Sequence, residues 1–198
     1  MQMSEIRTIL EKGGAVVLPT ETVYGLFAKA FDEDAVERVY ALKQRPKDKA
    51  MNLNVASLED IFRFSQNSPV FLEKVYNRFM PGPLTIILKS NKNVPFWINS
   101  GRDTVGFRVP KHEKTLQIIR DTGPLIGPSA NISGASSGVR FESIIQSFAE
   151  PVEGIADDQA ITGVDSTILD LSGPVARILR QGAITKEDLL RAVPELTF

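Results

Sequence analysis

The sequence predicts an α/β protein of the α+β type, in which helices flank one twisted, mixed β-sheet. Helical and strand-like segments alternate through the first part of the chain, whereas two strand-like segments follow one another within residues 166–179. Proline and glycine recur where these segments end, and binding groups are commonly found in such loops. A chain of 198 residues can bury a substantial core, so we expect residues 1–198 to form a single domain.

Apolar spacing and turn residues predict the elements in order. Apolar residues recur at helical spacing over residues 4–12, 34–42, 70–80, 114–121, 141–148 and 186–193. Short apolar runs predict strands over residues 15–18, 84–88, 105–109, 125–127, 166–171 and 175–179, and alternation of apolar and polar residues predicts a strand over residues 51–55. The turn Ser172-Gly173-Pro174 separates the last two runs and predicts a hairpin.

Side chains mark the starts of two helices, one of them the helix already predicted over residues 70–80. Ser57 followed by Asp60 resembles a capping box, which predicts a short helix after residue 57. Ser68 before Pro69 predicts an N-cap with proline at the first helical position, and that helix is expected to run to Met80.

Composition excludes several classes of protein. The chain has no cysteine, so it has neither a disulfide framework nor a thiolate metal site. Its net charge of −1 disfavours a protein that holds nucleic acid mainly through phosphate contacts, although a local basic cleft stays open. The N-terminus lacks the apolar region of a signal peptide, and no apolar run could cross a bilayer. We therefore expect a cytoplasmic protein.

The residues also exclude common catalytic motifs. His112 is the single histidine, which rules out a histidine-rich metal site, and its place before a helix predicts a structural surface residue. The stretch 127–131 superficially resembles a nucleophile elbow, but its last glycine is missing and the histidine precedes the serine. No Gly-Lys dipeptide and no G-x-G-x-x-G pattern occur. A bound nucleotide would need another kind of cradle.

Four cations lie within seven residues from Lys43 to Lys49, beside Pro46. Cations at a helix C-terminus are favoured by the macrodipole, which is one explanation of the cluster. A polyphosphate site is the other, because charge-assisted bonds to phosphate contribute about 1.5–3 kcal/mol each. A triphosphate usually needs a divalent ion as well.

Further polar groups follow the predicted strands. Residues 19–25 combine two threonines, Glu21 and Tyr24, and indicate either a polar loop with a helix cap or part of a site. Arg108 lies inside an apolar strand, where its partner is either a structural carboxylate or, as we favour, a substrate carboxylate. Residues 128–138 have the small hydroxyls and glycines of an anion nest, or of a flexible loop. Arg180 and the segment Asp165-Ser166-Thr167-Ile168 give weaker signals, which a surface arginine and a cap would also explain.

Taken together, these blocks resemble the YrdC family of L-threonylcarbamoyladenylate synthases, in its short form. The resemblance covers about residues 10–185 and rests on the ordered motifs PTETVYGL, KQRP, PGPLTIIL, VGFRVP, PSANISG, DSTILDL and ILRQGAI. It implies a YrdC-like fold with a concave active-site cleft. Longer members carry an additional C-terminal domain, for which we expect no room in this chain.

The resemblance also implies the roles of particular residues. Lys43 and Arg45 would stabilise charge during catalysis, and no general base is assigned. ATP would contact Lys43, Arg45, Lys49, Thr104, Ser129, Asn131, Ser137 and Arg180. L-Threonine would contact Thr22, Asn54, Arg108, Gly127 through its backbone, and Ser166.

Two positions depart from the family pattern. Asn54 stands where many members have a substrate-side histidine, and asparagine exchanges hydrogen bonds but does not titrate near neutral pH. Lys49 stands where a smaller polar residue is common.

The activity implied by the resemblance joins L-threonine, bicarbonate and ATP into threonylcarbamoyl-AMP, with release of pyrophosphate. Mg²⁺ would be held through the phosphates, because no compact Asp/Glu cluster is evident. Other proteins would then transfer the threonylcarbamoyl group to the adenosine beside the tRNA anticodon. Three alternatives stay open: a tRNA- or double-stranded-RNA-binding module, a carbamoyl-adenylating domain like that of hydrogenase-maturation proteins, and a sugar-phosphate enzyme.

Overall fold

The computed structural model covers residues 1–198 and contains one ten-stranded sheet. Its strands are β1 (Val16–Leu18), β2 (Gly25–Lys29), β3 (Asn52–Asn54), β4 (Ser65–Gln66), β5 (Leu84–Ser90), β6 (Thr104–Arg108), β7 (Leu125–Ile126), β8 (Glu153–Gly154), β9 (Thr167–Asp170) and β10 (Arg177–Arg180). They lie in the order β10-β9-β5-β6-β3-β7-β2-β1-β8, and β4 pairs with β5. Three pairs are parallel (β1/β8, β3/β6 and β5/β9) and the others are antiparallel, so the sheet is mixed.

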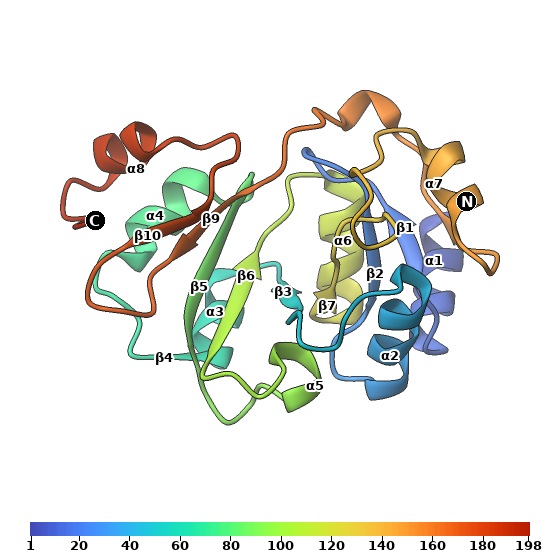
Figure 1. The fold of residues 1–198 in the computed structure, drawn as a ribbon, viewed down its shortest axis with the longest axis horizontal. Helices are drawn as coiled ribbons and strands as arrows, with labels where there is room; N and C mark the ends of the chain where they lie inside the picture. The colour runs from blue at the N-terminus through green and yellow to red at the C-terminus, as the bar shows by residue number, and fades with distance from the viewer.

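Helices flank this sheet, which confirms the predicted fold class. They are α1 (Met3–Glu11), α2 (Glu33–Lys43), α3 (Leu58–Phe64), α4 (Leu72–Phe79), α5 (Phe96–Asn99), α6 (Glu113–Thr122), α7 (Phe141–Ser147) and α8 (Lys186–Ala192), with a 3₁₀ turn at Asp158–Ala160. Figure 1 shows α4 and α8 beside β9 and β10 at the left, and α1, α2 and α7 around β1 and β2 at the right. None of the helices combines the length and the apolar character that a membrane crossing requires.

The strands at the right of Figure 1 are covered on both faces. Val16 and Leu18 of β1 and Phe27 of β2 share a buried cluster with apolar residues of α1 and α6. Their neighbours Val17 and Leu26 belong to the main core, which also contains the apolar face of α2. Because side chains alternate along a strand, each strand serves both layers.

The strands at the left and centre of the sheet, among them β3, β5, β6 and β9, have one apolar face and one mostly polar face. On one face, Leu53, Ile86, Phe107 and Leu169 are fully buried in the main core, together with residues of α3, α4 and α8. The residues between them point to the opposite face and are mostly polar. That second face forms the floor of the site.

Several predicted elements are confirmed with small shifts at their ends, among them the β9/β10 hairpin and the helix after Ser57. The Ser57 hydroxyl caps α3 by accepting from the amide of Asp60 at 3.2 Å. The expected return bond differs, because the Asp60 carboxylate accepts from the amide of Ala56.

One prediction is wrong. The helix expected from Ser68 begins only at Leu72, because the Ser68 hydroxyl bonds the hydroxyl of Ser65 at 3.1 Å and caps no helix. Of the two interpretations left open for residues 19–25, the helix cap is not observed, because the segment leads directly into β2, a strand that was not predicted.

Candidate functional site

A cavity of about 400 Å³ lies over the polar face of the central strands. Nine of the thirteen residues predicted for the site line it: Arg45, Lys49, Asn54, Thr104, Arg108, Gly127, Ser129, Ser166 and Arg180. The other four, which are Thr22, Lys43, Asn131 and Ser137, do not line it. The volume lies within the range of small-molecule sites.

Sheet register explains how the cavity floor is assembled. Asn54 is the Cα partner of Arg108, Arg108 of Thr85, and Thr85 of Ile168, whose partner is Arg180. Paired residues project to the same face of a sheet. Five strands therefore contribute one row of side chains, all of which line the cavity although they lie far apart in sequence.

Two glycines permit close packing beside this row. A Cβ atom on Gly127 would lie 2.4 Å from Cε1 of the Phe27 ring and 2.9 Å from Nδ2 of Asn54. A Cβ atom on Gly106 would lie 2.2 Å from Oδ1 of Asn52. Glycine at both positions leaves space for these amide groups, and at residue 127 it leaves backbone at the cavity wall.

Arg108 is held in place by two groups that follow β1. Its Nη2 donates to Oε1 of Glu21 at 2.5 Å and to Oγ1 of Thr22 at 2.8 Å. The other Glu21 oxygen accepts from the amide of Lys111 at 2.6 Å. Arg108 therefore has the structural carboxylate partner that the sequence left open. Its Nε–H, however, is buried without any partner.

Asn54 is a mostly buried residue at the cavity wall. It is 4% exposed and lines the cavity, and its amide atoms are not among the buried polar atoms that lack a partner. The amide therefore reaches the cavity and is not sealed in the core. Asn54 is therefore available to a molecule in the cavity, beside Arg108.

Ser166 connects the two arginines of the floor. Its hydroxyl lies 2.9 Å from the hydroxyl of Thr85, the Cα partner of Arg108. Arg180 donates from Nη2 to the same hydroxyl at 3.0 Å and from Nε to the Ser166 carbonyl at 3.0 Å. Arg180 has no carboxylate partner, so its charge is not neutralised by the protein.

Arg45 is positioned by the end of α2. Gln44 adopts a left-handed conformation at φ 50°, which ends the helix and turns the chain. The Arg45 guanidinium then donates to the carbonyls of Lys49 and Ala50, the second at 2.7 Å. Burial lowers the pKa of Arg45, although arginine stays protonated in proteins. The cavity thus receives a cation held by neutral carbonyls.

Lys43 lies behind the cavity wall. It is 1% exposed, and its ammonium donates to the carbonyls of Ser129 and Asn131, the latter at 2.5 Å. Burial, and then the charge of Arg45, lower the pKa of Lys43 from 10.5 to about 8. We expected Lys43 to contact phosphate directly. In the structure its ammonium instead donates to the two backbone carbonyls and holds that loop in place.

The loop after β7 is fixed against β2 as well. The amide of Leu26 donates to the Pro128 carbonyl at 2.8 Å, and the amide of Ala130 donates to the Tyr24 carbonyl at 2.7 Å. Ser129 faces the cavity between these bonds. The Asn131 side chain instead donates to Ile132 and Ala135 carbonyls, and its Oδ1 is buried without a partner.

His112 is not the surface residue expected. Its side chain is 9% exposed, with Nε2 lying 3.0 Å from the carboxylate of Asp157. It also caps α6. Both contacts are away from the cavity lining, which contains no histidine.

Several lining residues were not among the predicted site residues, including Asn52, Arg102 and Asp165. Asn52 alternates along β3 with Asn54, which was predicted, so this alternation could have identified Asn52 as well. With Arg102, five cationic side chains line the cavity, and the others are Arg45, Lys49, Arg108 and Arg180. Asp165 is the single carboxylate among the lining residues. No group of three or more His, Cys, Asp or Glu side chains is placed to hold a metal ion.

The family model Sua5_yciO_yrdC, described as telomere recombination, matches residues 8–182. The chain belongs to this family. Among curated relatives, the threonylcarbamoyl-AMP synthase of Pyrococcus abyssi is 38% identical over 94% of this chain and 56% of that protein. The threonylcarbamoyl-AMP synthase of Bacillus subtilis is 34% identical over 95% of this chain and 55% of that protein. The chain thus spans about half the length of these relatives.

Solved structures of this Sua5/YciO/YrdC family share the fold. P. abyssi Sua5 complexed with L-threonine has a TM-score of 0.91 and 36% identity, covering 100% of this chain and 59% of that one. Escherichia coli YciO has a TM-score of 0.81 and 27% identity, covering 91% of this chain and 89% of that one. The row of side chains across five strands therefore lies on a scaffold that the family shares.

Proposed function

We propose that this chain forms threonylcarbamoyl-AMP and pyrophosphate from L-threonine, bicarbonate and ATP. The observation that carries the proposal is the composition of the cavity, in which five cations and one carboxylate line a space of about 400 Å³. ATP, bicarbonate and the threonine carboxylate are all anions, so a site for the three needs an excess of positive charge. The names of the two curated relatives support this activity, as does the bound L-threonine of P. abyssi Sua5.

The amino-acid end of the site is assigned to the centre of the sheet. Arg108 has an Nε–H without a protein partner, and Asn54, its Cα partner on the neighbouring strand, lines the same cavity. An arginine that also bonds a carboxylate of the protein is held in one orientation, which lowers the entropy lost on binding a substrate. Thr22 does not line the cavity, so its role is to hold Arg108.

The triphosphate is assigned to Arg45, Lys49, Ser129 and Arg180, which line the cavity without carboxylate partners. Lys43 supports this set from behind by holding the backbone of Ser129. Thr104, Asn131 and Ser137 remain proposed ATP contacts, of which Thr104 alone lines the cavity.

The reaction follows in two steps. The α-ammonium of threonine first loses a proton to solvent. The neutral amine then attacks the carbon of bicarbonate, so that a C–N bond forms, a C–O bond breaks and water leaves. A carbamate oxygen then attacks the α-phosphorus in line, and the bond to the bridging oxygen breaks to release pyrophosphate. The protein supplies positioning and charge, as in other phosphoryl transfers.

Mg²⁺ fits the proposal only as an ion held by the nucleotide. The lining offers one carboxylate, and Mg²⁺ commonly binds through one or two carboxylates plus substrate phosphates. When bound, it would neutralise phosphate charge. The product would pass to proteins that transfer the threonylcarbamoyl group to tRNA.

The test is incubation with ATP, labelled bicarbonate and L-threonine, followed by mass detection of threonylcarbamoyl-AMP and assay of pyrophosphate. Labelled product that requires all three substrates supports the proposal. Adenylate formed from carbamoyl phosphate without threonine would contradict it and favour the carbamoyl-adenylating alternative. RNA binding that weakens with salt, without any ATP turnover, would favour a binding module.

A further inference from the structure

Asp165 is the one carboxylate in a cavity lined by five cations, and it has no assigned role. It forms no salt bridge with any of these cations. Its carboxylate accepts no hydrogen bond from the protein, although the residue is partly buried. A charged group with no internal partner, beside so many opposite charges, is available for a ligand.

The backbone fixes Asp165 close to the groups that hold Arg108. Two residues earlier, the amide of Gly163 donates to the Thr22 carbonyl at 2.9 Å, and the Thr22 hydroxyl accepts from Arg108. One residue later, the Ser166 hydroxyl lies 2.9 Å from that of Thr85, the Cα partner of Arg108. The Asp165 carbonyl also accepts from the amide of Ala183 at 3.3 Å. The chain on both sides of Asp165 is therefore tied to neighbours of Arg108.

The charges of the substrates identify what an isolated carboxylate would bind. ATP and bicarbonate carry only negative charge, whereas an α-amino acid carries an ammonium group beside its carboxylate. A site that holds a zwitterion needs one positive and one negative partner a few ångströms apart. Arg108 and Asp165 line the same cavity and carry these two opposite charges.

We infer that Asp165 binds the α-ammonium group of the amino-acid substrate while Arg108 binds its carboxylate. This inference rests on the proposed function, because it names a further contact of the same amino-acid site. It distinguishes α-amino acids from hydroxy acids of the same size, which lack the positive charge.

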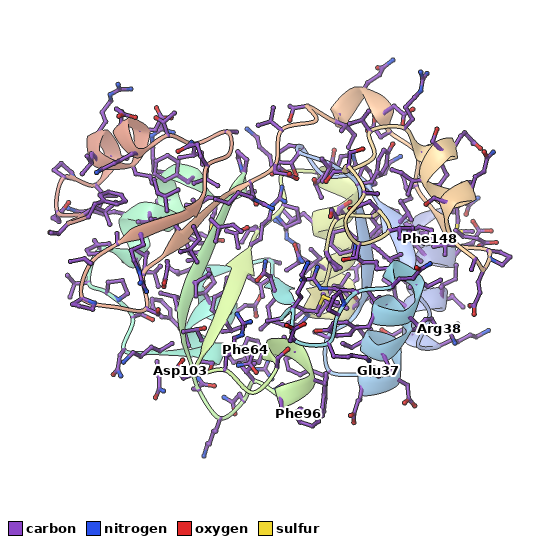
Figure 2. The ribbon with its side chains drawn as sticks, viewed as in Figure 1. Glu37, Arg38, Phe64, Phe96, Asp103 and Phe148 are labelled. Atoms are coloured by element: carbon purple, nitrogen blue, oxygen red, sulfur yellow. The ribbon has the colours of Figure 1, made fainter.

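The experiment measures binding by calorimetry with the full chain and the variant Asp165→Asn, which keeps the shape and removes the charge. Asp103→Asn is the matched control, since Asp103 is exposed, does not line the cavity, and lies at the end of β6 in Figure 2. The ligands are L-threonine, its 2-hydroxy analogue (2,3-dihydroxybutanoate) and ATP with and without Mg²⁺. Circular dichroism and thermal unfolding show whether each variant is folded.

We expect Asp165→Asn to weaken L-threonine binding about 10- to 100-fold, which is the loss of one charge-assisted hydrogen bond. Binding of the hydroxy analogue should stay unchanged, and ATP should bind equally well or more tightly, because a negative charge has been removed. Asp103→Asn should bind all ligands as the wild type does. Rescue by Asp165→Glu would further support a direct charge contact.

Two results would overturn the inference. One is unchanged L-threonine affinity in a folded Asp165→Asn variant. The other is a variant whose ATP binding weakens only when Mg²⁺ is present, which would make Asp165 a metal ligand. If the wild type itself binds no L-threonine, the proposed function fails, so the two failures can be told apart.

Discussion

Arg108 shows at the scale of one residue how a buried charge can be both structural and functional. The sequence allowed a protein carboxylate or a substrate carboxylate, and the structure provides Glu21 while leaving Nε–H free. The two roles are compatible because a guanidinium has five donors in a rigid plane. Lys43 differs from Arg108, because it belongs to a basic cluster but its side chain is buried behind the cavity wall and has only a structural contact.

Arg108→Ala should weaken L-threonine binding about 10- to 100-fold, because a charge-assisted hydrogen bond to the substrate carboxylate is lost. Arg108→Lys keeps the charge without the planar guanidinium and should lose part of this affinity. Calorimetry with threonine and with ATP measures both effects, and ATP affinity should change far less. An unchanged threonine affinity in a folded Arg108→Ala protein would remove this residue from the amino-acid site.

Arg45→Ala should lower ATP-dependent pyrophosphate release by at least about 100-fold, because a positioned cation next to the phosphates is removed. Lys47→Ala is the matched control from the same segment. Lys47 pairs with Glu37, which lies with Arg38 on α2 in Figure 2, and it does not line the cavity. If folded Arg45→Ala turned over as fast as the control, the phosphate assignment would be wrong.

The pKa of Lys43 makes stability depend on pH. Its pKa is about 8 in the folded chain against 10.5 ordinarily, so between these values the unfolded chain binds more protons. The free energy of unfolding should therefore rise with pH from about 8 to about 10.5, by up to about 3 kcal/mol, relative to Lys43→Met. Urea unfolding at several pH values measures this difference. A difference that does not change with pH would contradict the shifted pKa.

Elements with a clear period could be predicted from sequence, while short or doubly buried ones could not. The amphipathic helices α1, α2 and α6 were found because one face is apolar. β2 was missed because Gly25–Ala28 is buried on both faces and shows no alternation. The start of α4 was placed too early because Ser68 finds a hydroxyl partner that sequence does not reveal.

At the end of β7, Gly127→Ala should destabilise the protein by about 1–3 kcal/mol through overpacking. The new Cβ atom would lie 2.4 Å from the fully buried Phe27 ring and would also displace Asn54. Gly173→Ala is the matched control, since its Cβ atom would meet no atom closer than 4.0 Å. Chemical unfolding gives the stabilities, and threonine affinity should fall only in the first variant. Equal stability of the two variants would show that the ring moves aside freely.

For the whole molecule, the mixed sheet was predictable, but its strand order was not. Parallel pairing of β5 with β9 joins residues about 80 positions apart, and no local pattern encodes it. The site depends on this order, because Arg180, Thr85, Arg108 and Asn54 align only through register. Sequence therefore indicated nine of the residues that line the cavity, but it did not show which predicted side chains, such as Lys43, point away.

The net charge of the whole chain does not describe the charge of its cavity. The chain carries a net charge of −1, yet its cavity lining has five cations and one carboxylate. ATP affinity should therefore fall with ionic strength, by about tenfold between 0.05 and 0.5 M salt, because added ions screen this local field. Binding of zwitterionic L-threonine should change less than about twofold. Calorimetry at fixed Mg²⁺ and several KCl concentrations measures both affinities. If the two ligands were equally sensitive to salt, the excess positive charge of the cavity would not act mainly on the nucleotide.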